Sequence, residues 1–416
     1  MNVFERDLLT DPELIQDPAP YYAELREHGT VVREPHRGVF LISGIEEILT
    51  ICADHRSFSA VVAPLGPFVE MPEPAEGETI ADVVANRCDD IPLSGQLFTM
   101  DPPKHTRHRT LLNKLLTPNR LKENEEFMWT LADALIDEFA DRGEADLCNV
   151  YAAPFTLLVI ADLLGVPHED HERFRGWLKG EGSPVVGDAE GMAAGDQVFA
   201  NLHPYFNRYI EERRATPRDD VLTHLATVRF PDGALPEVAD VVRIAATLFA
   251  AGQETTARLI ASGMRVLAEQ PSLADELRAD PAAIPNFVEE CLRLESPIKG
   301  AFRLVLRDTQ IAGVDIPMGS IVMVMNAAAN RDPRVFEDAD RFDAKRSNAR
   351  RNITFGHGEH FCPGASLARA EARISFERLI ARLDDLQVVD PSALSYLPSF
   401  IIRGLTDLPL RFQRRS

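Results

Sequence analysis

Segment 236–268 constrains the fold of this chain more than any other part of the sequence. Its middle is almost entirely apolar or small, and it has no internal proline. This pattern predicts one helix buried on nearly all sides, because a helix that is hydrophobic all round lies inside a protein. At about 1.5 Å per residue, such a helix is long enough to cross the whole molecule. The rest of the chain is therefore expected to pack around it.

Helical periodicity also dominates the remaining sequence. The spacing of Ala368, Ala372, Phe376 and Ile380 predicts an amphipathic helix that begins just after residue 364. Other helices are predicted over 124–141, 153–165, 194–214 and 284–294. Strands are fewer, with hairpins predicted over 31–43 and 309–326 and short strands near 400–402 and 408–412. No repeat or linker divides the 416 residues, so we expect one large domain, mainly α with a small β region.

The stretch 58–100 is predicted to be an irregular lid. It contains Pro64, Pro67, Pro72 and Pro74 and several acidic residues, and it shows no clear periodicity. Loops of this length in compact domains tend to be functional or disordered. A lid over a ligand-access path is the interpretation that we adopt.

Composition and charge exclude several classes of protein. The net charge of −21 argues against nucleic acid, because phosphate binding needs a positive surface. The five cysteines are scattered and odd in number, which indicates a reducing compartment and no disulfide framework. Neither a signal peptide nor an apolar run of about 18 residues is recognisable, so a cytoplasmic, membrane-free monomer is expected.

The loop 355–364, Phe-Gly-His-Gly-Glu-His-Phe-Cys-Pro-Gly, is the segment that says most about function. Cys362 stands just before a helix start, where unpaired backbone N–H groups and the helix dipole favour a thiolate. Gly358 and Gly364 lack a Cβ, so the loop can fold tightly and a flat ligand can approach the sulfur. Phe355 is expected to form an aromatic wall nearby. The pattern predicts a thiolate presented to a large planar group.

Two other interpretations of Cys362 must be weighed. A lone cysteine is most often buried and inert. A zinc site formed by His357, His360 and Cys362 lacks a fourth ligand at a usual spacing, since the chain has no Cys-x-x-Cys pair. Neither alternative explains why the whole glycine-rich pattern precedes a helix.

The loop resembles the haem-ligand loop of the cytochromes P-450, whose pattern Phe-x-x-Gly-x-His/Arg-x-Cys-x-Gly is met at every fixed position. The resemblance implies that Cys362 is the axial ligand of the iron of haem b, and that 1–416 forms one domain of that fold. It extends over nearly the whole chain, with five motifs in the expected order.

The segment Ala251-Gly-Gln-Glu-Thr-Thr256, in the middle of the long helix, is expected to open a groove. Thr255 can donate its hydroxyl to the carbonyl of Ala251, which loosens the helix there. The segment resembles the oxygen-activating motif Ala/Gly-Gly-x-Asp/Glu-Thr of the same family. The resemblance implies that Gly252 makes room for O₂, while Glu254 and Thr255 relay protons.

Haem propionates need cationic partners, preferably guanidinium groups. Four residues match the family's positions for this role, namely His105, Arg109, Arg303 and His360. The Glu290-x-x-Arg293 pair resembles a structural pair of the family, and Arg341 matches its third, basic member.

The resemblance also implies which residues face the substrate. They are mostly small or apolar: Thr247, Ala250, Ala251, Ile298, Ile401, Ile402 and, in the lid, Leu97. Lys299 is the exception and is expected to meet a carboxylate or to reach solvent. A small hydrophobic substrate is therefore expected.

The implied activity is monooxygenation, in which one oxygen atom of O₂ enters the substrate. Electrons would come from a separate ferredoxin, reduced by an NAD(P)H-dependent ferredoxin reductase. Two alternatives remain open at this point. One is a peroxide-using or isomerising haem-thiolate enzyme without a redox partner, and the other is a non-catalytic haem-binding sensor.

Overall fold

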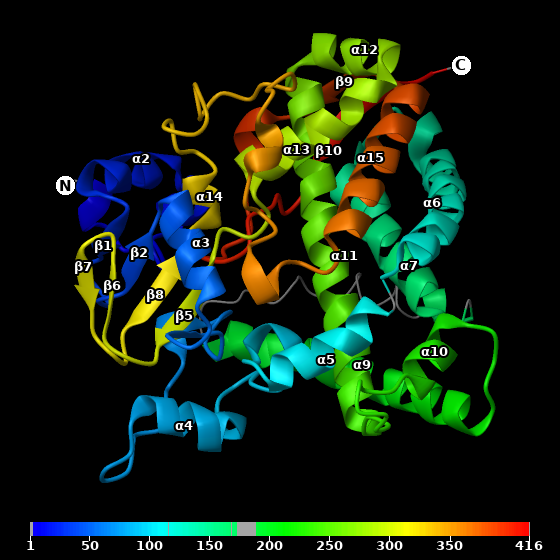
Figure 1. The fold of residues 1–416 in the computed structure, drawn as a ribbon. Coiled ribbons are helices and arrows are strands. Elements are labelled where there is room, and N and C mark those ends of the chain that lie inside the picture. Colours follow the sequence, from blue (N-terminus) through cyan, green and yellow to red (C-terminus); the bar gives the residue numbers. More distant parts are fainter. Residues whose placement is uncertain (1–2, 115, 168, 173–188, 416) are drawn as a thin grey trace.

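A computed structural model describes residues 3–114, 116–167, 169–172 and 189–415. A small sheet region lies beside a larger helical body, and the 32-residue helix α11, Val238–Glu269, runs through the middle of that body (Figure 1). At about 1.5 Å per residue α11 is about 48 Å long. It ends at Gln270, immediately before Pro271, which cannot donate a backbone hydrogen bond to continue the helix. The central helix is thus confirmed.

Around α11 pack the helices that the periodicity predicted. They are α6 (Pro118–Phe139), α7 (Ala153–Leu164), α9 (Ala189–Ala215), α13 (Ile284–Glu295) and α15 (Ala365–Arg382). Further helices of the body are α5 (Lys104–Asn113), α10 (Val221–Thr227) and α12 (Pro271–Ala279). Within the described residues no helix is both long and apolar enough to cross a membrane.

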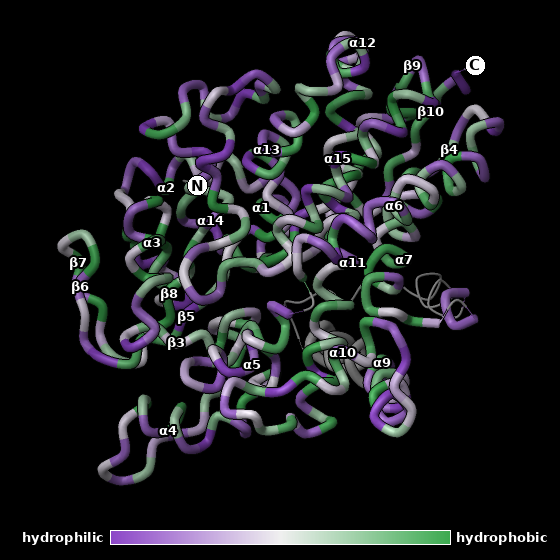
Figure 2. The backbone as a smooth tube through the Cα atoms, turned by 45° about the vertical axis from the view of Figure 1, so that its right-hand side comes forward, coloured by the Kyte–Doolittle hydropathy of each residue, from purple (hydrophilic) through white to green (hydrophobic). Residues whose placement is uncertain are grey.

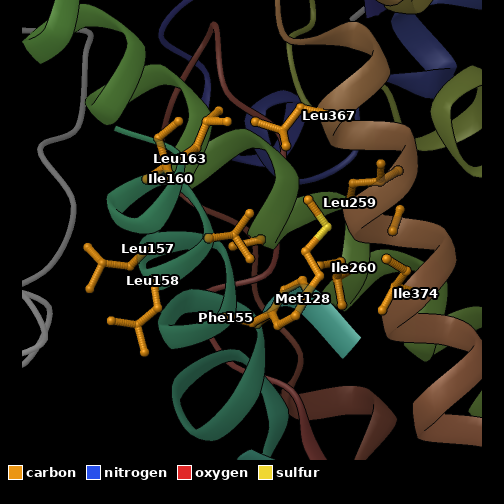
Figure 3. Close-up of a cluster of buried hydrophobic side chains, with 14 of the residues drawn as sticks. Met128, Phe155, Leu157, Leu158, Ile160, Leu163, Leu259, Ile260, Leu367 and Ile374 are labelled. Carbon is orange, nitrogen blue, oxygen red and sulfur yellow. The ribbon is translucent and has the colours of Figure 1, made fainter. Parts of the chain in front are cut away.

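The main core lies between these helices. Side chains from α6, α7, α11 and α15 gather into one apolar cluster (Figure 3). The tube of α7 is hydrophobic over most of its length, because this helix is covered on nearly all sides (Figure 2). At Gly263 of α11 a Cβ atom would collide with the ring of Phe376 on α15. This glycine therefore allows α15, which follows Cys362, to pack directly against the central helix.

The β region is small and built from distant parts of the sequence. Its five-stranded sheet has the order β1-β2-β8-β5-β3, and two smaller sheets have the orders β4-β10-β9 and β6-β7. The strands are β1 (Val31–Arg33), β2 (Phe40–Ile42), β3 (Phe58–Ser59), β4 (Glu144–Asp146), β5 (Ala301–Val305), β6 (Thr309–Ile311), β7 (Val314–Ile316), β8 (Ile321–Val324), β9 (Leu383–Val388) and β10 (Pro409–Arg414). Short helices α1 (Pro12–Gln16), α2 (Ala19–His28), α3 (Ile45–Ala53) and α14 (Asn326–Ala329) accompany the sheet (Figure 1).

Two strand predictions need correction, and a third is confirmed. The 309–326 region forms one hairpin, β6–β7, whereas β8 leaves it to pair with β5 and, in parallel, with β2. Residues 400–402 form no strand and contribute only a bridge between Ile402 and Ile298. The 408–412 prediction corresponds to β10, which pairs with β4 and β9. Strands that pair with partners this far away in the sequence leave no local pattern from which the pairing could be predicted.

The predicted lid over 58–100 is less irregular than expected. It contains helix α4 (Ile80–Arg87) and short 3-10 turns at Gly66–Phe68, Cys88–Asp90 and Leu97–Thr99. Thr79 and Asp82 form a reciprocal capping box at the start of α4. That pair was readable in the sequence, so the missed helix was predictable.

Candidate active site

A cavity lies where the loop 355–364, α11, α15, α5 and the lid meet. Eleven of the predicted site residues line it: Leu97, His105, Arg109, Thr247, Ala251, Gly252, Thr255, Phe355, His360, Cys362 and Gly364. Leu112, Ile244, Leu248 and Leu367 supply further apolar wall. Residues more than 250 positions apart in sequence thus converge on one chamber.

The Cys362 loop is held by its own backbone. The N–H of Cys362 donates to the carbonyl of Phe355 (2.9 Å), and α15 begins at Ala365, three residues beyond the cysteine. The N–H of Gly364 donates to the sulfur, and it and the charges of Arg109 and Arg369 lower the pKa of the thiol. Burial has the larger effect and raises that pKa above the ordinary value. In the protein without a ligand, the effect of burial therefore outweighs the effects that favour the thiolate of Cys362.

Two predicted features of this loop have different physical roles. Gly358 has φ +69°, and a Cβ atom there would collide with the carbonyl of Cys52, but this glycine does not line the cavity. It fixes the turn and does not make room for a ligand. The ring of Phe355 lines the cavity as expected, and the guanidinium of Arg369 stacks 4.5 Å from its centroid.

The predicted propionate ligands include ring nitrogens that lack hydrogen-bond partners, although Nδ1 of His105 lies 4.0 Å from the carboxylate of Glu359. Both ring nitrogens of His105 and Nε2 of His360 have no hydrogen-bond partner, and the two rings lie 4.2 Å apart. Burial, together with nearby cationic groups, lowers the pKa of His105 to about 4 and that of His360 to about 2. Buried polar atoms are normally paired, so this cluster lacks acceptors that a ligand would bring.

The two arginines of this cluster lead to the same conclusion. Arg303 on β5 is 6% exposed, donates only to the carbonyl of Phe302, and has no ion-pair partner among the described residues. Arg109 donates to the carbonyl of Phe361 (2.6 Å) and lines the cavity. A dianionic, flat ligand with carboxylates near these four residues and its centre over Cys362 fits the donor set. Haem b is such a ligand.

On α11 the predicted hydrogen bond of Thr255 is present. Thr255 donates its hydroxyl to the carbonyl of Ala251 (2.9 Å), and Gly252 lines the cavity beside it. Glu254 does not line the cavity; its carboxylate lies 3.4 Å from Nη2 of Arg258, which itself donates to the carbonyl of Leu405. The acid of the predicted pair is thus already partnered, whereas the alcohol faces the chamber.

Glu371 is a cavity-lining acid that we did not predict. It lies on α15, is almost completely buried, and is hydrogen-bonded to Thr256, the neighbour of Thr255. Burial raises the pKa of Glu371 to about 8, so the carboxyl holds its proton at neutral pH. A glutamate within the apolar stripe of Leu367 and Ile374 was the available signal.

The predicted substrate-facing residues divide into two groups. Thr247, Ala251 and Leu97 line the cavity, but Ala250, Ile298, Lys299, Ile401 and Ile402 do not. Lys299 neither reaches solvent nor meets a carboxylate, which corrects the sequence-based expectation. It is 5% exposed, and its Nζ donates to the carbonyls of Ser399 (2.7 Å) and Ile15 (3.4 Å). It connects α1 to the C-terminal region.

Lys299 should make the stability of the protein depend on pH. Burial, and secondarily Arg403, lowers its pKa from 10.5 to about 7, so between these values the unfolded state binds the extra proton. The cost in stability of burying the charged Lys299 is complete below about pH 7 and decreases as the pH rises towards 10.5. Relative to Lys299→Met, the wild type should gain about 2 kcal/mol of unfolding free energy between about pH 7 and pH 9.

Urea unfolding of both proteins at the two pH values measures this difference. Lys345→Met serves as the control, because Lys345 lies at the surface beside Glu276. If the unfolding free energies of wild type and Lys299→Met differ by the same amount at both pH values, the pKa of Lys299 is not lowered in the folded protein.

The Glu290–Arg293 pair is confirmed as a structural element of α13. Both side chains are fully buried and form a bidentate pair at 2.8 Å. The third basic residue is Arg346, whose Nε lies 3.1 Å from Glu290, and not Arg341. Arg341 has an exposed side chain and contributes only its carbonyl, to Arg293 and Arg346. A position match could not distinguish two arginines five residues apart in one loop.

The zinc alternative finds no support. No group of three histidine, cysteine, aspartate or glutamate side chains in the described parts of the chain is arranged to hold a metal ion. His360 turns towards His105 in the cavity. At this site Cys362 is thus available to bind a metal ion that is part of a larger ligand.

Comparisons with known proteins agree with this geometry. A family model described as Cytochrome P450 matches residues 193–388. Cytochrome P450 monooxygenase PikC of Streptomyces venezuelae is 35% identical over 405 residues, which cover 96% of this chain and 92% of PikC. The Vitamin D(3) 25-hydroxylase of Pseudonocardia autotrophica is 36% identical over 404 residues, covering 96% of this chain and 95% of that protein.

A solved structure is similar over the full length of the fold. Substrate-free cytochrome P450 CYP150A6 of Mycobacterium marinum superposes with a TM-score of 0.91 at 45% identity, covering 99% of this chain and 100% of that one. Similarity in sequence and in fold therefore extends from the sheet region through α11 to the cysteine loop. A chain with this loop, this central helix and relatives matched end to end belongs to the cytochrome P450 family.

Proposed function

We propose that this P450 monooxygenase oxidises a small, largely apolar substrate in the cavity over Cys362, with electrons delivered by a separate ferredoxin. Membership of the family gives the reaction class and the haem b cofactor. The observation that supports this site is the cavity itself. It brings the Cys362 sulfur, the ring nitrogens of His105 and His360 that lack hydrogen-bond partners, Arg109, and Gly252 and Thr255 of α11 into one chamber.

Haem b, when bound, supplies the iron that binds and activates O₂. Cys362 is proposed as its axial ligand, because its sulfur lines the chamber and accepts the N–H of Gly364. Pro363 has no N–H, so Gly364 is the nearest downstream donor. His105, Arg109, Arg303 and His360 would hold the two carboxylates of the cofactor and fix its orientation.

The proton supply is proposed to come from α11 and α15. The Thr255 hydroxyl, whose own proton is directed to the Ala251 carbonyl, leaves its lone pairs free to accept a bond in the groove. Glu371 holds a proton nearby, because it is hydrogen-bonded to Thr256, which follows Thr255 in the sequence. Glu254 is bound to Arg258, so it takes part only after that ion pair opens. Thr255 is the residue on which the proposal depends most.

The apolar lining suits a hydrophobic substrate. Leu97, Phe98, Ile244 and Leu248 surround the space on the α11 side. A relative at 36% identity is named as a hydroxylase of vitamin D(3), which is in keeping with a hydrophobic substrate here. Burial of such a compound would provide most of its binding free energy.

A separate ferredoxin is proposed as the electron donor because the resemblance to the P450 family implies one. Exposed cations such as Arg107, which pairs with Asp232, and Lys345, which pairs with Glu276, would face an acidic ferredoxin, reduced in turn by an NAD(P)H-dependent reductase. The five free cysteines are in keeping with a cytoplasmic location.

Thr255→Ala should separate electron consumption from product formation. With a surrogate ferredoxin and reductase, we expect haem content and substrate affinity to stay unchanged, because no other contact is lost. Product per NAD(P)H should fall roughly tenfold or more, with hydrogen peroxide formed instead, since a positioned proton relay contributes on the order of 10²–10⁴ in rate. The measurement is the ratio of product and peroxide to NAD(P)H consumed.

Thr130→Ala is the matched control. Thr130 makes the same hydroxyl-to-carbonyl bond, to Glu126 on α6, but on an exposed helix face away from the cavity. It should leave coupling unchanged. Fully coupled turnover by Thr255→Ala would remove Thr255 from the mechanism, and turnover with peroxide alone, but none with ferredoxin, would favour the peroxide-using alternative.

A further inference from the structure

A buried hydroxyl group on α7 is bonded to the central helix just behind the cavity. Thr156 is fully buried, and its Oγ1 lies 2.7 Å from the backbone carbonyl oxygen of Gln253 on α11. Gln253 lies between Gly252 and Thr255, two residues that line the cavity. The hydroxyl of Thr156 therefore binds the same helical turn, residues 251–255, to which Thr255 belongs.

The hydroxyl of Thr156 has two other acceptors within reach, and both are less favourable. The carbonyl oxygens of Ala152 and Ala153, about one turn earlier in the chain, lie 3.1 Å and 3.3 Å from Oγ1. A hydroxyl group has one proton to donate, and O–H···O bonds are most common at about 2.7–2.8 Å. Threonine in a helix can return that proton to its own helix. Here the shortest bond goes to Gln253, so the hydroxyl joins two helices.

The position of Gly252 shows that α7 forms the wall behind this turn. A Cβ atom at Gly252 would lie 3.5 Å from Cδ1 of Ile160, which is ordinary van der Waals contact. Ile160 is four positions after Thr156 on α7, so both side chains lie on the same face of that helix. The 251–255 turn thus has the cavity on one side and α7 on the other.

Two hydroxyl groups hold the 251–255 turn from opposite sides. Thr255 donates to the carbonyl of Ala251 (2.9 Å), and Thr156 donates to the carbonyl of Gln253. Residues two positions apart are separated by about 200° around a helix, because each residue turns it by about 100°. A carbonyl oxygen has two lone pairs, so each can accept a hydroxyl in addition to a helical N–H. The two bonds together restrict how this turn can rotate.

We infer that Thr156 is a positioning residue for oxygen activation. Its bond to the Gln253 carbonyl fixes the 251–255 turn, and thereby the direction in which the Thr255 hydroxyl faces the chamber. Thr156 does not line the cavity, so it acts through Thr255. The inference rests on the proposed function, because it requires that Thr255 takes part in the reaction.

The test compares Thr156→Val and Thr156→Ser with the wild type, each loaded with haem. Valine has nearly the volume of threonine but lacks the hydroxyl group, whereas serine keeps it. The reduced proteins are saturated with carbon monoxide in the absence of substrate, and the infrared stretching band of the bound carbon monoxide is recorded. This band responds to nearby polar groups, so it reports the orientation of the Thr255 hydroxyl.

We expect the band of Thr156→Val to be shifted or split relative to the wild type, and the band of Thr156→Ser to be unchanged. Reduced Thr156→Val should also be reoxidised by O₂ roughly three- to tenfold faster, the factor for one net hydrogen bond. Thr156→Ala gives the same readouts if the valine variant does not fold. Wild-type bands and rates in the variants without the hydroxyl would overturn the inference, and so would an equal shift in Thr156→Ser.

Leu158→Val is the control for a general loosening of α7. Leu158 is buried on the same helix, but it lies two positions from Thr156 and therefore on the opposite side. Its band and its reoxidation rate should match the wild type, and a shift as large as that of Thr156→Val would contradict the inference.

Thr255→Ala distinguishes a failure of this inference from a failure of the proposed function. If the band moves in Thr255→Ala but not in the Thr156 variants without a hydroxyl, only the role of Thr156 is refuted. If the band stays at its wild-type position in Thr255→Ala, the proposed role of Thr255 has failed as well.

Discussion

Arg293→Met should lower the free energy of unfolding by about 3–5 kcal/mol, the usual cost of breaking a buried ion pair from one side. Arg293 donates to both oxygens of Glu290 and to the carbonyls of Asn330, Ala339 and Arg341. Methionine keeps much of the volume but leaves these acceptors without that donor. Because the total stability of proteins is about 5–15 kcal/mol, the variant should unfold at much lower urea and retain less haem.

The chain provides a matched control in Arg341→Met. The Arg341 side chain is exposed, and only its carbonyl takes part in the network, so its loss should change stability by less than about 0.5 kcal/mol. Urea unfolding of the wild type and both variants measures the two losses of unfolding free energy. Equal losses for the two variants would contradict the assignment of Arg346, and not Arg341, as the second cation on Glu290.

Cys362→His should abolish monooxygenation while leaving the fold intact. A cysteine thiolate pushes electron density towards the iron and favours O–O cleavage, and an imidazole does so much less. Rates with ferredoxin and reductase should therefore fall roughly a hundredfold or more, the upper range for changes near a metal. His105, Arg109, Arg303 and His360 remain in the variant, so haem should still bind.

Cys88→His is the control for this substitution. Cys88 lies in a short turn of the lid and does not line the cavity. Its replacement should leave both haem content and turnover close to those of the wild type. Substantial turnover by Cys362→His would mean that the sulfur is not needed for the chemistry.

Local sequence was sufficient to predict the elements with strong periodicity. The apolar stretch around Leu248 and the stripe around Phe376 predicted α11 and α15, because one continuous helix face carries the signal. The pairing of β8 with β2 and β5 was not predictable, since the partners are far apart in the sequence. Helix α4 was missed although Thr79 and Asp82 signalled its start.

The candidate site shows the same division. The Thr255 bond to Ala251 was predicted because it is local to one helix turn. The surroundings of Lys299 were predicted wrongly, because its carbonyl partners come from residues 15 and 399, which only the folded chain brings together. Glu371 was missed for a related reason, because its hydrogen-bond partner, Thr256, lies on another helix.

The absorption spectrum of the reduced, CO-bound protein tests the central claim most directly, because it reports the atom that binds the iron. If Cys362 is the axial ligand, the wild type should show the red-shifted Soret band of a thiolate-ligated haem. Cys362→His should lose that band at equal haem content. An unshifted, histidine-like Soret band in freshly prepared, folded wild-type protein would contradict the account.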